Sequence, residues 1–213
     1  MQIPVFAVED SAPTLRALRK LLAARPEVAV VGTAVSGEEA LREIPAAAPR
    51  VVLMDLELPG ASGVETTREL KKRCELEVLV LTSFEDEDHV FESMRAGASG
   101  YVVKGAVADK LIGAIVEVEQ GGTVIEPRLA KRFWHYFKGV QEPGKPEAPA
   151  LTDVEREILF AIARGLSNEE AGRMVQQGRR AVRTHLGHIY RKLGVRSHVE
   201  AVVKALRLGL IEL

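Results

Sequence analysis

The 213-residue sequence contains a single cysteine, Cys74, and aromatic residues make up only 5% of it. One cysteine excludes an internal disulfide framework and a zinc site built on thiolates. No apolar run approaches the roughly 18 residues that a membrane helix requires. The N-terminus has no basic segment before an apolar block, which argues against a signal peptide. We therefore expect a soluble, cytoplasmic protein that does not bind membranes.

The chain also has little net charge, −1 at pH 7, but this balance hides an asymmetry. Residues 151–213 contain 11 Lys and Arg against 7 Asp and Glu, a balance of +4, whereas residues 1–150 contain 18 against 23, a balance of −5. The length suits one or two domains, and 46% hydrophobic residues suffice for a buried core. An acidic N-terminal part and a basic C-terminal part predict two modules, the second of which binds a polyanionic partner.

Five short apolar runs alternate with amphipathic stretches along the first 120 residues. The runs are rich in Val and mostly lack polar alternation, which is typical of strands buried on both faces of a parallel sheet. The stretches between them have helical spacing, and Ser36 and Ser62 are placed to cap two of these helices. The pattern predicts a doubly wound α/β domain with a five-stranded parallel sheet. The runs are Ile3–Val8, Val28–Ala34, Val51–Met54, Val78–Leu81 and Gly100–Val103.

A proline-rich segment separates this domain from the rest of the chain. Gly121-Gly122 closes the α/β domain, and Pro127–Lys138 has the pattern of a helix. Residues 142–149 contain three prolines and no apolar period, as expected for a linker. We predict an α/β domain at residues 1–121, a linker with a helix at residues 122–149, and an all-α domain at residues 150–213.

The all-α domain has the layout of a four-helix domain with a helix–turn–helix. Capping boxes predict two helix starts, one at Thr152 with Glu155 and one at Ser167 with Glu170. The second helix is short, and a turn near residues 176–178 follows it. The turn leads into a longer helix that ends at Gly194, as in a DNA-binding helix–turn–helix.

Polar residues directly follow four of the five predicted strands. Glu9 and Asp10 follow the first strand, Asp55 the third, Thr82 the fourth and Lys104 the fifth. In an open parallel sheet, functional groups gather at the carboxyl ends of the strands. Carboxylates without His or Cys favour a hard cation such as Mg²⁺. We expect Asp55 to be a nucleophile that forms an aspartyl phosphate, with Thr82 and Lys104 on phosphate oxygens.

Four motifs of this domain resemble the receiver domain of two-component response regulators, over about residues 1–120. Their order, their strand context and their spacing all agree with that family. The resemblance implies a CheY-like doubly wound fold. The motifs are Glu9-Asp10, Asp55-Leu56-Glu57-Leu58-Pro59-Gly60, Leu81-Thr82-Ser83 and Ala96-Gly97-Ala98-Ser99-Gly100-Tyr101-Val102-Val103-Lys104.

This resemblance also implies a role for each site residue. Asp55 would be the phosphoacceptor and Lys104 the cation on the phosphate side. Thr82 would move toward the phosphate and Tyr101 would rotate inward, as a two-state switch. The Mg²⁺ ion would be held by Glu9, Asp10, Asp55 and the backbone carbonyl of Glu57.

The longer helix of the all-α domain separates apolar from basic residues. Val182, Leu186, Ile189 and Leu193 form its apolar face. Cations on the other face suit phosphates and base edges of DNA. That face carries Arg179, Arg180, Arg183, Thr184 and His188, with Arg191 and Lys192 further along.

About residues 148–213 resemble the LuxR-type DNA-binding domain, so the whole chain resembles a response regulator of the NarL/FixJ subfamily. The motifs include Gly165-Leu166-Ser167-Asn168-Glu169-Glu170, Val182-Arg183-Thr184-His185 and Ile189-Tyr190-Arg191-Lys192-Leu193-Gly194-Val195. The resemblance implies base readout by Arg183 and Thr184. It places Ser167, Arg179, Arg180 and His188 near phosphates, and it assigns a dimer contact to Val199, Val202, Val203 and Leu206.

The helix–turn–helix departs from the family pattern at several positions. Small residues stand at Ala171-Gly172, and Gln177-Gly178 and Ala181 replace an apolar residue, a serine and a threonine. Gly178 can cap a helix but has no side-chain oxygen, and a glycine inside a helix costs up to about 1 kcal/mol relative to alanine. These changes predict either closer packing of the two helices or a looser module.

We predict a transcription regulator that phosphorylation activates. A partner sensor histidine kinase would phosphorylate Asp55 with Mg²⁺ present, and the basic module would then bind double-stranded DNA as a homodimer. We expect no turnover of a dedicated substrate, although Asp55-Leu56-Glu57 also resembles the start of an aspartyl-phosphate phosphatase, a class that Leu58 and Pro59 fit badly. A further alternative is a regulator whose altered helix–turn–helix binds protein, or one that acts without phosphorylation.

Overall fold

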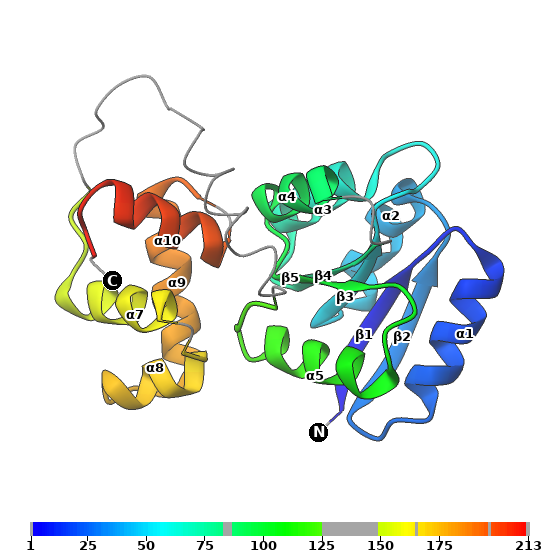
Figure 1. Ribbon diagram of the computed structural model, residues 1–213, viewed down its shortest axis with the longest axis horizontal. Coiled ribbons are helices and arrows are strands. Elements are labelled where there is room, and N and C mark those ends of the chain that lie inside the picture. Colours follow the sequence, from blue (N-terminus) through cyan, green and yellow to red (C-terminus); the bar gives the residue numbers. More distant parts are fainter. Residues whose placement is uncertain (1, 83–86, 125–148, 165, 196, 212–213) are drawn as a thin grey trace. The chain divides into compact units, whose positions relative to one another are not determined.

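The computed structural model describes residues 2–82, 87–124, 149–164, 166–195 and 197–211. The chain divides into two compact units, Met1–Glu119 and Gln120–Leu213, which we call the α/β unit and the helical unit. Figure 1 shows strands and helices in the first and only helices among the labelled elements of the second. The helix predicted at Pro127–Lys138, and nearly all of the proline-rich linker, lie outside the described residues.

The α/β unit has a five-stranded, fully parallel sheet in the order β2-β1-β3-β4-β5, which confirms the predicted fold. Helices cover both faces of the sheet, with α1 and α5 on one side and α2, α3 and α4 on the other (Figure 1). The strands are β1 Ile3–Val8, β2 Val28–Ala34, β3 Val51–Asp55, β4 Glu77–Thr82 and β5 Gly100–Val103. The helices are α1 Ala12–Ala23, α2 Gly37–Ala47, α3 Gly63–Arg73, α4 Glu87–Ala96 and α5 Ala108–Glu119.

Strands β3 and β5 are apolar between their ends because both of their faces are buried. All five residues of β3 and all four of β5 are buried. Burial on two faces removes the polar alternation that a half-exposed strand would show. The strands can therefore carry polar groups only at their ends, where Asp55 and Thr82 are the last residues of β3 and β4.

Serine caps begin three helices of the α/β unit. Ser36 and Ser62 each accept a hydrogen bond from the backbone three residues on, as predicted. Ser62 and Glu65 form a full capping box. Ser11 caps α1 in the same way, and its oxygen accepts hydrogen bonds from Thr14. A cap satisfies a backbone N–H that the helix leaves unpaired. These caps fix where the loops after β1 and β3 end.

The helical unit contains four described helices around a shared apolar core. Both predicted capping boxes are present, Thr152 with Glu155 and Ser167 with Glu170. The long helix ends at Gly194, whose φ of 64° is left-handed. The apolar face of that helix lies in the core, as predicted. The helices are α7 Asp153–Ala163, α8 Asn168–Met174, α9 Arg179–Leu193 and α10 His198–Arg207.

The turn between α8 and α9 depends on a close backbone approach at Gly172. A Cβ atom there would lie 2.5 Å from the Gln177 carbonyl oxygen and 3.3 Å from Val182 Cγ2. The Gln177 N–H donates to the Gly172 carbonyl oxygen at 2.8 Å, and Gln176 has a φ of 54°. Ala171 is fully buried in the core. The absence of a side chain at Gly172 therefore allows this close approach at the turn.

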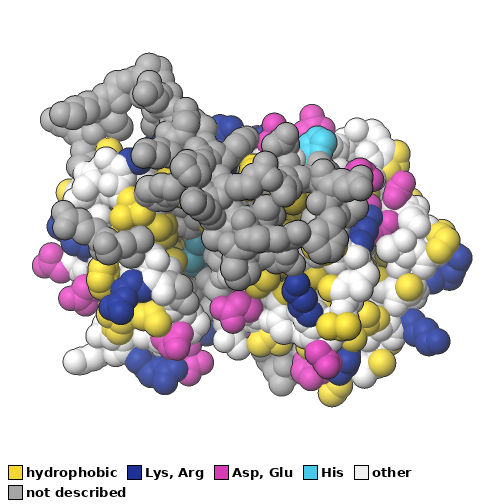
Figure 2. All heavy atoms as spheres, viewed as in Figure 1, with side chains coloured by type: hydrophobic (Ala, Val, Ile, Leu, Met, Phe, Trp, Pro, Cys, Tyr) yellow, Lys and Arg dark blue, Asp and Glu magenta, His cyan; other side chains and the backbone are white. Residues whose placement is uncertain are grey.

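None of the described helices is long and apolar enough to cross a membrane. On the face drawn in Figure 2, acidic and basic side chains of the described residues are interspersed and do not form one large patch of a single sign. A few polar side chains are buried and do not belong to this mixed surface. Among them are Glu9, Asp55 and Thr82 in the α/β unit and Glu155 in the helical unit.

Candidate functional site

Three carboxylates meet at the carboxyl edge of the sheet. Val8 of β1 pairs with Met54 of β3, so the next residues, Glu9 and Asp55, reach the edge side by side. Glu9 is fully buried, Asp55 is 2% exposed, and Asp10 is exposed to solvent. One oxygen from each of the three lies within 4.8 Å of the others. The sheet thus brings together the acidic residues that the sequence singles out.

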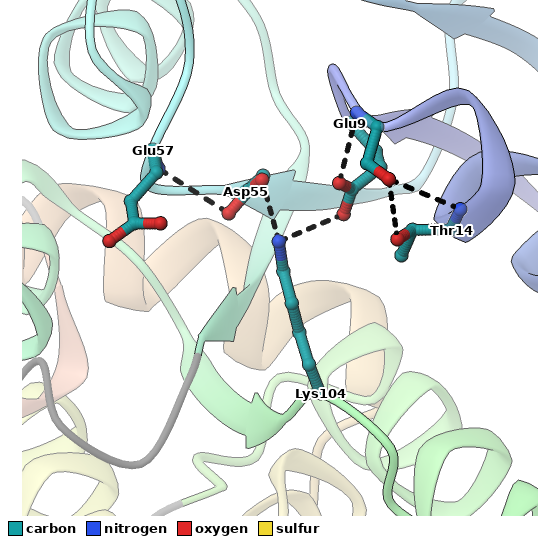
Figure 3. Close-up of polar contacts among 6 residues, drawn as sticks. Glu9, Thr14, Asp55, Glu57 and Lys104 are labelled. Carbon is teal, nitrogen blue, oxygen red and sulfur yellow. Dashed lines mark hydrogen bonds and ion pairs between the residues drawn. The ribbon is translucent and has the colours of Figure 1, made fainter.

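Lys104 reaches this cluster from β5, two strands away from Asp55. Figure 3 shows its side chain extending from the end of β5 to a point between Asp55 and Glu9. Lys104 Nζ donates to Asp55 Oδ2 at 2.7 Å and forms an ion pair with Glu9 Oε2 at 3.0 Å. One ammonium group therefore holds two carboxylates that would otherwise repel each other.

Backbone N–H groups fix the remaining carboxylate oxygens. The Glu57 N–H donates to Asp55 Oδ1, and the Ser11 N–H donates to Glu9 Oε1, each at 3.3 Å (Figure 3). The side chain of Glu57 itself is exposed. Loops that leave β1 and β3 thus orient the two buried carboxylates, and Glu57 takes part through its backbone.

Charge and burial act in opposite directions in this cluster. Burial raises the pKa of Glu9, the contact with Lys104 lowers it, and the charge of Asp55 raises it again, so the net change is upward. Burial alone would lower the pKa of Lys104, but the hydrogen bonds and charges of Asp55 and Glu9 raise it overall. Lys104 therefore stays protonated at neutral pH. Three carboxylates against one ammonium group leave excess negative charge at the edge of the sheet.

Thr82 and Tyr101 lie on the two strands beyond β3. Thr82 is 4% exposed, and its carbonyl oxygen accepts a hydrogen bond from the Lys104 N–H at 2.7 Å. Tyr101 is 2% exposed and pairs with Val80 on β4. Both residues of the predicted switch are therefore buried, with Thr82 at the same edge as Asp55.

The donor set suits a hard divalent cation. All three groups are carboxylates, their oxygens lie within 4.8 Å of one another, and the backbone of Glu57 borders Asp55. Mg²⁺ prefers oxygen ligands, is commonly bound by one or two carboxylates, and keeps several waters. Asp10 is exposed, so the cluster reaches solvent through this residue.

The predicted DNA contacts lie at the start of α8 and along α9. Ser167 caps α8, and its hydroxyl donates to Glu170 Oε2 at 2.8 Å. Arg180, Thr184 and His188 are exposed at successive turns of α9. The Thr184 hydroxyl donates to the Arg180 carbonyl oxygen at 3.2 Å. Arg179 and Arg183 are half-buried on the same helix. The six predicted residues are thus on the two helices of the helix–turn–helix.

Lys192 differs from the sequence prediction, which counted it among the cations of the DNA-facing surface. Its Nζ donates to Glu155 Oε2 at 2.6 Å and to the Ala150 carbonyl at 3.2 Å. Glu155 is 3% exposed and also accepts a bond from the Thr152 N–H. Lys192 therefore ties α9 to the start of α7. The sequence identifies Glu155 only as part of a capping box with Thr152. A capping box does not indicate which lysine elsewhere in the chain contacts the glutamate.

The apolar stripe of α10 is divided. Val202 and Leu206 pack against the core of the helical unit, and Val199 and Val203 are half-buried on the same helix. Part of the stripe therefore belongs to the core.

Comparisons with known proteins agree with both units. The family model described as the response regulator receiver domain matches residues 5–116. The model described as bacterial regulatory proteins of the luxR family matches residues 149–205. The first match covers more than half of the chain and contains the whole carboxylate cluster.

Curated relatives match over nearly the full length. The DNA-binding transcriptional activator DevR/DosR of Mycobacterium tuberculosis is 34% identical, over 97% of this chain and 95% of that protein. The transcriptional regulatory protein LnrK of Bacillus subtilis is 33% identical, over 97% and 98%. The response regulator protein VraR of Staphylococcus aureus is 32% identical over all of both chains.

Solved structures of response regulators have the same architecture. The response regulator ChrA of a haem-sensing two-component system is 30% identical over 99% of both chains, with a TM-score of 0.55. A LuxR-family response regulator from Aurantimonas sp. is 30% identical, with a TM-score of 0.58, over 64% of this chain and 98% of that one. The protein therefore belongs to the two-component response regulators of the NarL type, in which a receiver domain precedes a LuxR-type DNA-binding domain.

Proposed function

We propose that Asp55 accepts a phosphoryl group from a partner sensor histidine kinase and that this modification controls DNA binding by the helical unit. The observation that carries the proposal is the buried Asp55 carboxylate, held by Lys104 at 2.7 Å and by the Glu57 N–H at 3.3 Å. These bonds hold the carboxylate by both of its oxygens. Response regulators of this family are typically transcription regulators and not enzymes.

The transfer needs an ionised, oriented nucleophile. An Asp55 oxygen attacks the phosphorus of a phosphohistidine, an O–P bond forms, and the P–N bond to the kinase histidine breaks. Lys104 now donates to a carboxylate oxygen of Asp55. After the transfer, the same ammonium group can donate to a phosphate oxygen instead. Glu9, Asp10, Asp55 and the Glu57 carbonyl would hold Mg²⁺, and the ion would supply positive charge for the phosphoryl oxygens. The family generally binds Mg²⁺ at this acidic site.

Phosphorylation changes the charge at the end of β3. The new group carries between −1.5 and −2 charges and three acceptor oxygens. Lys104 then has a stronger partner than the carboxylate, and the Thr82 hydroxyl lies on the neighbouring strand at the same edge. We expect Thr82 to bond to the phosphoryl group and Tyr101 to move with it, which makes β4 and β5 the two-state element.

DNA binding falls to the helix–turn–helix. Arg183 and Thr184 are in the first half of α9, where a recognition helix reads base edges. We assign Ser167, Arg179, Arg180 and His188 to phosphate contacts. The balance of +4 over residues 151–213 supports a polyanionic partner. One helix reads few bases, so a homodimer on two half-sites supplies the affinity. We assign that contact to the half-buried stripe of α10, which comprises Val199, Val202, Val203 and Leu206.

Phosphoryl labelling tests the central assignment. Acetyl phosphate with Mg²⁺ adds one phosphoryl group to the chain, and intact-mass measurement detects it. Asp55→Asn abolishes the added mass because an amide cannot form the acyl phosphate. Glu57→Gln, which changes an exposed neighbour, keeps it. Undiminished incorporation in Asp55→Asn would contradict the assignment.

A further inference from the structure

A second group of potential metal ligands lies in the helical unit, away from the carboxylate cluster. Glu155 is the third residue of α7, and His185 and His188 lie one turn apart on α9. One ligand atom from each of the three lies within 4.8 Å of the others. Glu155 is buried, His185 is half-buried and His188 is exposed, so the group opens to solvent on one side.

One ring nitrogen of His185 has no hydrogen-bond partner among the described residues. Its Nε2 lies 3.2 Å from Gln177 Oε1, and an amide oxygen can only accept a hydrogen bond. When Nε2 carries the proton and donates to this oxygen, Nδ1 keeps its lone pair. Nδ1 is buried and has no hydrogen-bond partner within the described part of the chain. A buried acceptor without a donor is costly, and a cation would satisfy it.

Gln177 gives this histidine the arrangement that metal sites use. In such sites the ring nitrogen that does not bind the metal usually donates to an oxygen, which fixes the tautomer and the ring orientation. The Gln177 side chain takes that place at the turn before α9. The polar residue at this position, which departs from the family pattern, thus has a specific contact.

Glu155 completes the group with an anionic oxygen. The hydrogen bonds from Lys192 Nζ and the Thr152 N–H both reach Oε2, at 2.6 Å and 2.8 Å. A metal ion can therefore bind Oε1 while Lys192 stays on Oε2. The carboxylate would then be oriented from behind by hydrogen bonds, as ligating carboxylates usually are.

We propose that Glu155, His185 and His188 form a Zn²⁺ site that joins the start of α7 to the middle of α9. Two imidazoles and one carboxylate are a donor set that Zn²⁺ prefers and that Mg²⁺ does not. Three protein ligands leave a fourth position for water. The ion links two helices of the helix–turn–helix domain, so its binding stabilises that domain by mass action.

Zinc titration of the full-length protein tests the site. The chain is stripped with a chelator and kept in excess Mg²⁺, which occupies the carboxylate cluster of the receiver domain. Zn²⁺ is then added against a chromophoric competitor, and Co²⁺ serves as a spectroscopic probe. We expect one Zn²⁺ per chain, a tetrahedral Co²⁺ spectrum, and slower hydrogen exchange in α7 and α9.

Single histidine variants assign the ligands. His188 is exposed, so His188→Gln keeps the fold, and we expect it to weaken Zn²⁺ binding at least about tenfold. His185→Gln has the same effect, and circular dichroism shows whether it remains folded. His89→Gln, at an exposed histidine on α4, leaves binding unchanged. The proposal is overturned if no Zn²⁺ binds in excess Mg²⁺, or if His188→Gln binds it as tightly as the unmodified chain.

Discussion

Two lysines of this protein each contact buried carboxylates at similar distances, but the number of carboxylates around each lysine differs. Lys104 Nζ lies 2.7 Å from Asp55 and 3.0 Å from Glu9, and Lys192 Nζ lies 2.6 Å from Glu155. At the first site one ammonium group faces three carboxylates when Asp10 is included. At the second, one ammonium group faces one carboxylate, which also accepts a backbone hydrogen bond.

This difference separates a reactive site from a structural contact. Excess negative charge in the receiver domain favours a divalent cation. In the proposed function, that cation would allow the site to accept an anionic phosphoryl group. The pair of Lys192 and Glu155 is nearly neutral and joins two helices, so its bonds can persist. A short Lys–carboxylate distance therefore does not reveal function by itself. The charged groups around the lysine and the carboxylate determine the function of the contact.

Lysine-to-methionine variants test the comparison with the largest expected effect. Lys104→Met leaves Asp55 and Glu9 buried without their cation and should destabilise the receiver domain by about 2–4 kcal/mol, less than for a fully buried pair because Lys104 is 30% exposed. Lys192→Met should cost about 1–2 kcal/mol, since Lys192 is 36% exposed. Calorimetry with Mg²⁺ distinguishes the two, because Mg²⁺ restores only the Lys104 variant.

Lys20→Met, at an exposed lysine of α1, is the control and should unfold like the unmodified chain. If Mg²⁺ stabilises the Lys192 variant as much as the Lys104 variant, the two sites do not differ in charge balance as described.

Two glycines extend the comparison to the backbone. A Cβ at Gly63 would lie 1.9 Å from the Asp55 carbonyl oxygen, and one at Gly172 would lie 2.5 Å from the Gln177 carbonyl oxygen. Each alanine variant should lose about 1–3 kcal/mol of unfolding free energy through overpacking, and Gly63→Ala more than Gly172→Ala. Only Gly63→Ala should also slow phosphoryl labelling, because it displaces Asp55.

Gly187 of α9 supplies the matched control, since a Cβ at that position would have no neighbour within 4 Å among the residues that the structure describes. Gly187→Ala should stabilise the helical unit by up to about 1 kcal/mol through helix propensity. A stabilising Gly172→Ala would show that the turn before α9 is looser than described.

Lowering the pH should stabilise the receiver domain through Glu9 and destabilise the helical unit through Glu155. We expect these changes in unfolding free energy to be smaller than those of the lysine and glycine variants. The pKa of Glu155 is lowered by its bonds from Lys192 and Thr152 against the effect of burial, so its contribution is present above the ordinary value of 4.5 and is lost as the pH falls through the lowered pKa. The pKa of Glu9 is raised, chiefly by burial, so the cost of ionising it is present above that raised pKa and disappears as the pH falls toward 4.5.

Hydrogen exchange of the full chain measures both effects. As the pH falls from 7 to about 4.5, protection around β1 and β3 should rise relative to Glu9→Gln. Protection of α7 and α9 relative to Glu155→Gln should fall only below that range. Parallel behaviour of the two sites would contradict the assigned causes.

Much of this architecture is readable from the sequence because it depends on local signals. Buried strands read as continuous apolar runs, and the residue that ends each run lies at a known edge of the sheet, which is how Asp55 and Lys104 can be placed together. Capping boxes such as Ser167 with Glu170 predict helix starts within one residue.

Contacts between the helices of the helical unit could not be read in this way. Lys192 and Glu155 are 37 positions apart, and helical periodicity gives no distance between two helices. The partners of His185 depend on the turn at Gly172, whose close approach appears only when α8 and α9 are packed. The sequence shows which face of α9 is polar but not which of its cations are paired within the domain.

The most direct test of the account is the DNA affinity of the full chain with and without a phosphodonor. The target sequence can be selected from a random duplex pool, and affinity is then measured at fixed salt. We predict that acetyl phosphate with Mg²⁺ tightens binding of the unmodified chain at least about tenfold through dimerisation on two half-sites, and that Asp55→Asn does not respond. Equal tightening in Asp55→Asn, or no salt-dependent DNA binding in either protein, would contradict the account.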